Sequence, residues 1–250
     1  MSTQSSIEWT EITWNPVTGC SKVSEGCRFC YAERMATRLK AMGQKRYVNG
    51  FTVTLHADAL EDPFKWKNPR VVFVNSMSDL FHENVSVDFI KKIFEIMARC
   101  PRHTFQILTK RSRRLAELSD SLPWPSNVWI GVSVENIRVI HRIHDLKKVV
   151  SAKVRFLSCE PLLGPLTRLP LDGINWVIVG GESGPKARPI DEKWVKDILT
   201  QCESKSVPFF FKQWGGVRKD LTGRLLDGRI YDQMPPRGPV QSQLQVMASL

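Results

Sequence analysis

The sequence predicts an α/β fold in which a parallel sheet closes fully or partly into a TIM-type (β/α) barrel. Short apolar runs rich in Val, Ile and Phe recur from residue 71 onward at intervals of roughly 22 to 33 residues, which is typical of repeated strand–helix units. Amphipathic segments lie between these runs, and 250 residues with 42% hydrophobic content can bury one full core. We therefore expect a single domain over residues 1–234 and a disordered tail over residues 235–250, where the apolar periodicity ends.

Seven strands are expected, and each is apolar enough to be buried on both faces of a parallel sheet. They are residues 12–14, 71–74, 104–108, 128–132, 154–157, 176–179 and 207–211. The clearest helices are residues 87–100 and 194–202, where apolar side chains recur at helical spacing. Residues 51–56 form either an eighth strand or a small β insertion.

Composition limits where this protein works. No segment approaches the eighteen or so apolar residues of a membrane span, and the first residues lack the basic and apolar blocks of a signal peptide. Three cysteines are scattered (Cys100, Cys159 and Cys202) and three are clustered, which favours a reducing compartment over a disulfide scaffold. We expect a cytoplasmic protein that does not associate with membranes.

The formal net charge of +11 and the isoelectric point near 9.6 concern partners rather than fold. Basic residues recur over residues 34–46, 65–70 and 110–114. Clustered Lys and Arg attract phosphate without sequence preference, so DNA or RNA is the first candidate partner. Solvated helix faces are the alternative explanation of the same charge.

Three cysteines in one short loop carry the strongest functional signal. Cys20, Cys27 and Cys30 lie within eleven residues, and an odd number of thiolates suits a metal centre that keeps one coordination position open. Gly19 and Gly26 would let backbone amides approach the sulfurs. A zinc site is the alternative, although none of the five histidines lies at zinc-finger spacing from these cysteines.

The cysteine loop, residues 19–31, resembles the cluster loop of radical S-adenosylmethionine (SAM) enzymes, including the aromatic Phe29 before the last cysteine. Its first gap, six residues between Cys20 and Cys27, is longer than the commonest spacing in that superfamily. The resemblance implies that the three cysteines hold three irons of a [4Fe-4S] cluster and that the fourth iron binds SAM. It also implies reductive cleavage of SAM to a 5′-deoxyadenosyl radical, with electrons from a reductant such as flavodoxin or ferredoxin.

Further runs between residues 7 and 216 are similar to a phage and bacterial family of radical-SAM-like proteins of unsettled function. They are Ile-Glu-Trp-Thr, Thr-Trp-Asn-Pro-Val-Thr-Gly-Cys, Gly-Val-Ser-Val-Glu-Asn, Cys-Glu-Pro-Leu-Leu-Gly, Gly-Gly-Glu-Ser-Gly and Phe-Lys-Gln-Trp-Gly. A shorter run, Leu108-Thr109-Lys110-Arg111, resembles spore photoproduct lyase, a radical SAM enzyme group that repairs a thymine lesion in DNA. This second likeness agrees with the basic charge in favouring a nucleic-acid substrate.

Polar residues follow every predicted strand from residue 71 onward. In a parallel barrel these positions converge on one rim, where active sites of this architecture are built, although such loops also cap helices. The candidate cofactor-binding residues are Asn75, Ser76, Ser78, Asp79, Ser133, Glu135, Gly180, Gly181 and Glu182, and the candidate catalytic residues are Lys110, Cys159 and Glu160.

The resemblance suggests roles for several of these residues. Gly180-Gly181-Glu182 resembles the motif that holds the amino group of SAM, but in the superfamily that motif follows the second strand. Residues 75–79 occupy the expected place, so both segments are candidates. From their places just past strands, Glu135 and Glu160 could bind ribose hydroxyls or position substrate, and Lys110 and Arg111 could pair with a carboxylate or phosphate. The Cys159 thiol, at a strand exit on the cluster side, could donate a hydrogen atom to a substrate radical. A small buried thiol is the alternative for Cys159.

The sequence thus predicts a radical SAM-like iron–sulfur enzyme acting on DNA or RNA. A different class of function is also consistent with it, namely a non-catalytic nucleic-acid-binding protein whose cysteines hold structural zinc or an Fe–S cluster. An enzyme requires a reducible cluster that responds to SAM, whereas a binding protein would keep its nucleic-acid affinity with a redox-silent metal.

Overall fold

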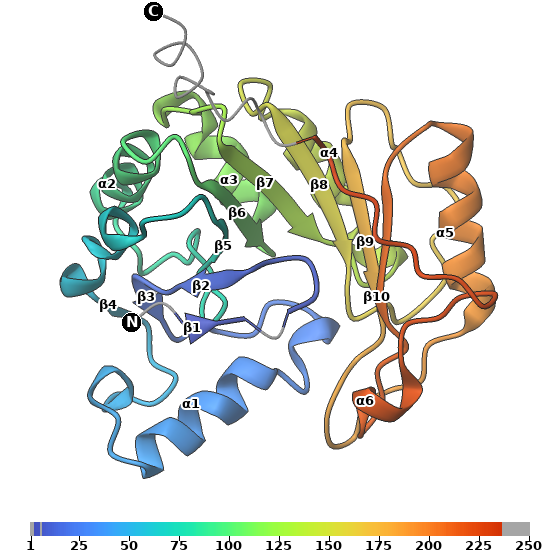
Figure 1. Cartoon of the computed structure of the whole chain (residues 1–250), viewed down its shortest axis with the longest axis horizontal. Helices are drawn as coiled ribbons and strands as arrows, with labels where there is room; N and C mark the ends of the chain where they lie inside the picture. Colours follow the sequence, from blue (N-terminus) through green and yellow to red (C-terminus); the bar gives the residue numbers. More distant parts are fainter. Residues whose placement is uncertain (1–2, 6, 237–250) are drawn as a thin grey trace, which may run out of the picture.

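The computed structural model describes residues 3–5 and 7–236 and contains an eight-stranded curved sheet (Figure 1). Its order is β1-β2-β5-β6-β7-β8-β9-β10; β1 pairs antiparallel with β2, and all other pairs are parallel. The seven predicted strands are confirmed. Because β2 and β10 do not pair, the barrel is partial. The bounds are β1 Thr3–Gln4, β2 Ile12–Trp14, β5 Val71–Val74, β6 Thr104–Thr109, β7 Val128–Ser133, β8 Val154–Cys159, β9 Trp176–Gly180 and β10 Phe209–Gln213.

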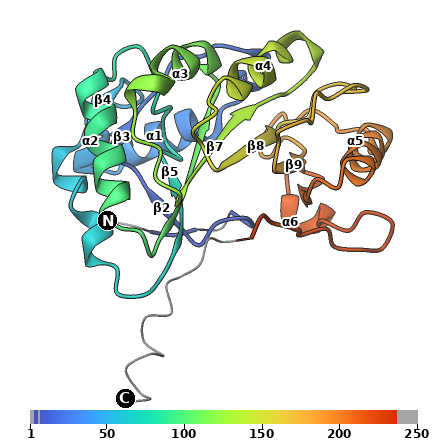
Figure 2. The same cartoon turned by 90° about the horizontal axis from the view of Figure 1, so that it is seen from above.

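Helices cover the convex face of this sheet, as Figure 2 shows for α2 to α5. Helix α2 begins after Ser86, whose hydroxyl accepts a hydrogen bond from the amide of Phe89, and it buries Ile93 and Met97 against the sheet. The α-helices are α1 Tyr31–Ala41, α2 Val87–Ala98, α3 Ser112–Leu118, α4 His141–Lys147, α5 Glu192–Ser204 and α6 Lys219–Thr222. The 3-10 turns are η1 Glu25–Cys27, η2 Lys45–Tyr47, η3 Ala57–Ala59, η4 Asp62–Lys65, η5 Ser119–Ser121 and η6 Ile137–Val139. Both predicted helices are confirmed.

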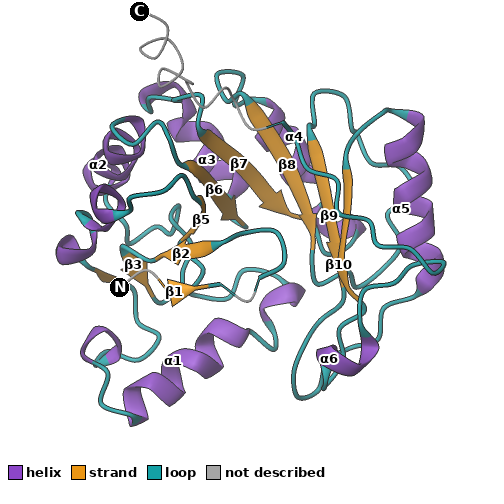
Figure 3. Cartoon of the chain, in the orientation of Figure 1, coloured by secondary structure: helices purple, strands orange, loops and turns teal. Residues whose placement is uncertain are grey.

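A small second sheet lies beside the first, coloured as strand in Figure 3. Strands β3 (Val17–Thr18) and β4 (Thr54–Leu55) pair antiparallel. Residues 51–56 are therefore a small β insertion and not an eighth strand of the barrel. The insertion packs at the base of the cysteine loop, because β3 leads directly into Gly19 and Cys20.

Alternation along the strands separates two apolar layers. Mostly aliphatic side chains fill the space between sheet and helices, whereas a mostly aromatic layer fills the concave face. The Trp176 ring contacts those of Trp9, Trp129, Phe156 and Phe210, with centroid separations of 6.2, 6.0, 5.5 and 5.9 Å. Trp9 comes from the segment before β2, so this segment adds a ring to the aromatic layer on the concave face.

The segment after α6 lies along the last strand. The amide of Phe211 donates to the carbonyl of Tyr231 at 2.9 Å, and the indole of Trp176 donates to the carbonyl of Gln233 at 2.8 Å. The predicted disorder of residues 235–250 falls outside the described residues except at Pro235 and Pro236, and Pro235 is buried. Among residues 3–5 and 7–236, no helix combines the length and apolarity needed to cross a bilayer.

Candidate functional site

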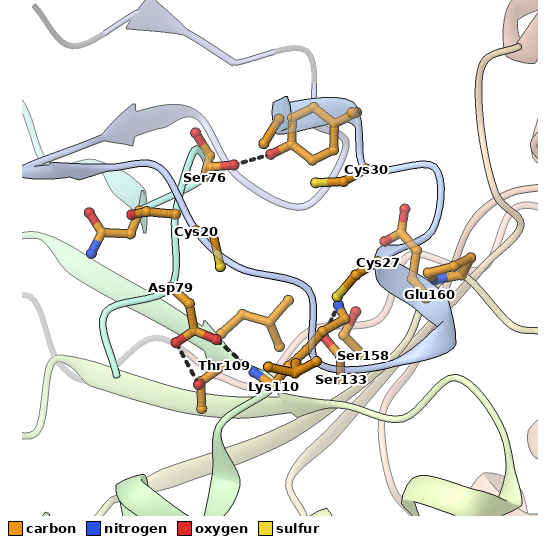
Figure 4. Close-up of a pocket in the computed structure, with 18 of the residues that line it drawn as sticks. Cys20, Cys27, Cys30, Ser76, Asp79, Thr109, Lys110, Ser133, Ser158 and Glu160 are labelled. Carbon is orange, nitrogen blue, oxygen red and sulfur yellow. Dashed lines mark hydrogen bonds between the residues drawn. The ribbon is translucent and has the colours of Figure 1, made fainter. Parts of the chain in front are cut away.

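A cavity of about 360 Å³ opens where the carboxyl ends of the parallel strands meet the cysteine loop (Figure 4). This volume lies within the usual range of small-molecule sites. The apolar part of the cavity wall consists of Ile7, Trp9, Phe73 and Leu108. The lining also includes twelve of the fifteen predicted site residues: Cys20, Cys27, Cys30, Asn75, Ser76, Ser78, Asp79, Lys110, Ser133, Glu160, Gly181 and Glu182.

The cysteine loop is anchored at both ends. Gly19 has φ of +83°, and a Cβ at this position would overlap the carbonyl of Thr52, so only glycine fits. The amide of Gly19 donates to the carbonyl of Met77 at 3.0 Å. At the other end, Cys30 is the N-cap residue of helix α1. The loop therefore holds its cysteines between the small sheet and the start of a helix.

The three thiols are free, partly exposed and turned toward one open space, as Figure 4 shows for Cys20, Cys27 and Cys30. Within the described part of the chain, no three His, Cys, Asp or Glu side chains lie close enough together to hold a single metal ion. Three thiols around one space leave one coordination position open, as a metal centre that binds a cofactor requires, whereas a closed zinc site has four ligands.

Arg111 connects the loop to the exit of β5. Its guanidinium donates to Cys20 Sγ at 3.4 Å, to Asp79 Oδ2 at 3.3 Å and to Glu83 Oε2 at 2.9 Å, and its side chain is only 8% exposed. Burial and the charge of Asp79 raise the pKa of the Cys20 thiol to about 11, although Arg111 opposes this shift. Arg111 is thus the cation placed to stabilise a thiolate or an anionic cluster at Cys20.

Glu135 contacts the cysteine loop at Ser24 and Gly26 but does not line the cavity. It is 1% exposed, accepts from Arg142 Nη1 at 2.9 Å and from Ser24 Oγ at 2.6 Å, and lies against Gly26, where a Cβ would overlap it. Lys110 Nζ lies 3.8 Å from the same carboxylate. This burial leaves Glu135 as a residue that positions the cysteine loop, and does not match the predicted contact with ribose hydroxyls.

Glu182, the acid of the Gly-Gly-Glu run, is held by a bidentate ion pair. Arg188 donates to its two carboxylate oxygens at 2.8 and 2.6 Å and also reaches Glu25 in the cysteine loop at 3.4 Å. Burial opposes ionisation of Glu182, but the hydrogen bonds from Arg188 outweigh it and lower the pKa. Gly181 allows close approach of the Trp214 carbonyl, and Gly180 does not line the cavity.

The segment after β5 presents polar atoms that mostly tie loops together. Asp79 is buried and accepts from Thr109 Oγ1 at 2.7 Å and from the amide of Lys110 at 3.0 Å. Asn75, at φ of +62°, accepts from the amide of Val17. Ser76 and Ser78 bond to the strand exit before the cysteine loop: Ser76 Oγ donates to Asn15 and Ser78 Oγ donates to the carbonyl of Val17.

Two lysines bring positive charge to the cavity wall. Lys110 Nζ donates to Ser133 Oγ at 3.0 Å, and Lys212 forms an ion pair with Glu160. The Lys212 and Glu160 side chains are 13% and 19% exposed, so both remain reachable from the cavity. Lysines in such a setting can receive a carboxylate or phosphate group of a ligand.

The placement of Cys159 corrects one prediction. Side chains alternate along a strand, so Ser158 lines the cavity while Cys159 lies on the opposite face of β8, fully buried in the layer between sheet and helices. Burial and the neighbouring Cys202 raise its pKa. Its thiol cannot reach a substrate in the cavity, and it is the small buried thiol that was the alternative.

Sequence reasoning missed two of the three arginines that hold the site together. Arg142 lies in α4, where a charge at a buried helical position was the available signal, and Arg188 follows the Gly-Gly-Glu run by six residues. Lys212 lies near the end of β10 in a run that the rim argument covered, but it was not among the predicted site residues. Which distant acid each cation meets depends on the tertiary fold.

Comparisons with known proteins agree with this architecture. A family profile described as "Protein of unknown function (DUF5131)" matches residues 4–235. The chain belongs to this DUF5131 family. No curated protein matches it. Among solved structures, a tyrosine-to-phenylalanine mutant of spore photoproduct lyase aligns with a TM-score of 0.58 at 12% identity, covering 86% of this chain and 79% of that one.

Two further structures of spore photoproduct lyase are similar in fold. A cysteine-to-serine mutant has a TM-score of 0.54 at 15% identity over 74% of this chain. A double mutant with bound AdoMet and dinucleoside spore photoproduct has a TM-score of 0.51 at 12% identity, covering 80% of this chain and 63% of that one. This DUF5131 protein spans 60% of the length of the first of these structures. At such identities the likeness concerns the fold.

Proposed function

We propose that this DUF5131 protein is a radical SAM enzyme that carries a [4Fe-4S] cluster on Cys20, Cys27 and Cys30. One observation carries the proposal: three thiols from a single loop face a cavity at the carboxyl ends of a parallel half-barrel. The likeness in fold to spore photoproduct lyase, one structure of which holds AdoMet, supports the same assignment.

When bound, such a cluster supplies an electron to SAM and thereby the radical chemistry of the enzyme. The protein's own residues position and shield this site. Arg111 orients the Cys20 thiolate and offsets negative charge, while Glu135 holds the loop through Ser24. Lys110 and Lys212 are placed to bind anionic groups of cofactor or substrate, and the apolar wall with Trp9 excludes water.

The substrate class in this proposal is nucleic acid. The net charge of +11 supports it, and the spore photoproduct lyase structure that holds AdoMet also holds a dinucleoside photoproduct. A small electron-transfer protein of the flavodoxin or ferredoxin kind would provide the reducing electron.

Iron and sulfide analysis after anaerobic purification tests the proposal. About four irons per chain are expected, with an electron paramagnetic resonance signal after dithionite reduction that changes when SAM is added. Cys27→Ala and Cys30→Ala should lose the cluster. Cys100→Ala is the matched control, because Cys100 is buried after α2 and does not line the cavity.

Two results would contradict the proposal. One is stoichiometric zinc in the anaerobic protein, and the other is a cluster whose signal does not respond to SAM. Either result would favour the non-catalytic nucleic-acid-binding protein with a structural metal.

A further inference from the structure

Helix α1 carries an exposed row of basic and apolar side chains. Tyr31, Arg34, Met35, Arg38 and Met42 recur at spacings of three and four residues, which places them on one side of the helix. Tyr31, Met35 and Met42 are 48%, 42% and 60% exposed, and both arginines are exposed. We call these five residues the α1 stripe.

The opposite side of α1 accounts for its packing. Ala32 and Ala36 are buried with Met77, and Leu39 packs against this small cluster. Figure 1 shows α1 apart from the helices that cover the sheet. The α1 stripe is therefore not needed for the core, and its apolar members remain exposed at a cost that a binding partner would offset.

Charge identifies the kind of partner. Residues 31–50 contain five basic residues and one acid, Glu33, whose carboxylate is already paired with Lys22 at 2.9 Å. The surface is thus strongly cationic. Its charges within the α1 stripe are arginines, which bind phosphate oxygens through two parallel hydrogen bonds.

Position connects this surface to the candidate site. The α1 stripe begins at Tyr31, which lines the cavity and directly follows Cys30, and it extends outward for about 17 Å at 1.5 Å per residue. Arg34 also contacts the carbonyl of Ser183, in the loop after β9 that forms the other side of the cavity mouth. A chain lying on the α1 stripe would lead directly into the cavity.

We infer that the α1 stripe is the docking surface for a single strand of nucleic acid, with phosphates on Arg34 and Arg38 and bases against Tyr31, Met35 and Met42. Interleaved cations and flat or apolar side chains are typical of surfaces that bind single strands. An acidic protein would also complement the positive charge of this surface. Unlike a substrate strand, however, it would not need to reach the cavity that Tyr31 lines. As the path of the substrate, this surface rests on the proposed function.

Fluorescence anisotropy with a labelled, mixed-sequence DNA strand of about 12 nucleotides tests the inference on the full-length, cluster-loaded protein. Arg34→Gln/Arg38→Gln should weaken binding at least about fivefold and reduce the slope of log K against log salt by about 1.4, since each phosphate contact with a single strand contributes about 0.7. Arg38→Gln alone, which leaves the contact to Ser183 intact, should reduce the slope by about half as much.

Lys148→Gln/Lys153→Gln is the matched control. It removes the same charge from exposed side chains near the amino end of β8, opposite the cavity, and should leave the slope nearly unchanged. Equal losses in both double variants, absent binding of the strand, or equal displacement by poly-glutamate of matched charge would each overturn the inference. The SAM-dependent cluster signal of Arg34→Gln/Arg38→Gln, measured in parallel, separates this outcome from failure of the proposed enzyme.

Discussion

Strands β7, β8 and β9 are buried along almost their entire length, whereas the loop after the two-residue strand β3 leaves three thiols partly exposed. The first region is stabilised by apolar contacts on both faces of the sheet. The second is held by charged side chains that reach it from other strand exits: Arg111, Glu135 and Arg188. Packing thus builds a rigid frame, and ion pairs position a polar loop that apolar contacts alone could not hold beside a cavity.

The largest expected effect belongs to the packed region. Trp176→Ala removes a fully buried ring that contacts four other aromatic rings, and should lower the free energy of unfolding by about 3–5 kcal/mol in urea titrations. Trp176→Phe should lower the free energy of unfolding by less, and it serves as the second variant if Trp176→Ala does not fold. Iron content per folded chain should not change. A decrease in the free energy of unfolding of less than about 1 kcal/mol for Trp176→Ala would contradict the view that packing stabilises this region.

Breaking the buried ion pair tests the link between the two regions. Arg142→Met leaves Glu135 buried without its closest cation, and should lower the free energy of unfolding by about 3 kcal/mol and reduce cluster retention. The double variant Glu135→Gln/Arg142→Met removes both charges and should recover part of the stability. Equal stability of the single and double variants, measured by urea unfolding, would exclude the buried charge as the cause.

Arg111 should affect the cysteine loop more than the frame. Arg111→Gln removes a cation 3.4 Å from Cys20 Sγ, so the cluster should become harder to reduce and its midpoint potential more negative in a redox titration followed by electron paramagnetic resonance. The free energy of unfolding should fall by about 2 kcal/mol from lost charged hydrogen bonds. Arg113→Gln is the control, because Arg113 lies two residues further along in α3 with a 90% exposed side chain, and it should change neither quantity.

The smallest effect concerns pH. Burial lowers the pKa of His56 and of His103, with Arg46 and Arg102 adding to the respective shifts. Below pH ~6.5 the unfolded chain therefore binds more protons than the folded one, and stability should fall as pH decreases from about 7.5 to 5.5. Urea unfolding of His56→Gln should show a shallower pH dependence than the parent chain, and an unchanged dependence would exclude His56.

Local patterns were sufficient to predict much of this protein. The strand positions follow from short apolar runs, because a strand buried on both faces must be apolar at every position. Cys20, Cys27 and Cys30 could be found because their spacing is local, and the rim residues Lys110, Ser133 and Glu182 because parallel strands end at one edge. The prediction for Cys159 was wrong because neighbouring side chains of a strand point to opposite faces of the sheet. Ser158 faces the cavity, so Cys159 faces the helices.

The sequence by itself therefore determined the order of the strand and helix units, the cysteine loop and the edge on which polar residues gather. Tertiary structure alone decided that β2 and β10 stay unpaired, that Trp9 fills the concave face, and that Arg111, Arg142 and Arg188 meet acids or a thiol far away in the chain. The physical reason is that periodicity reports which side chains are buried locally, whereas the partner of a buried charge is chosen by how distant segments pack.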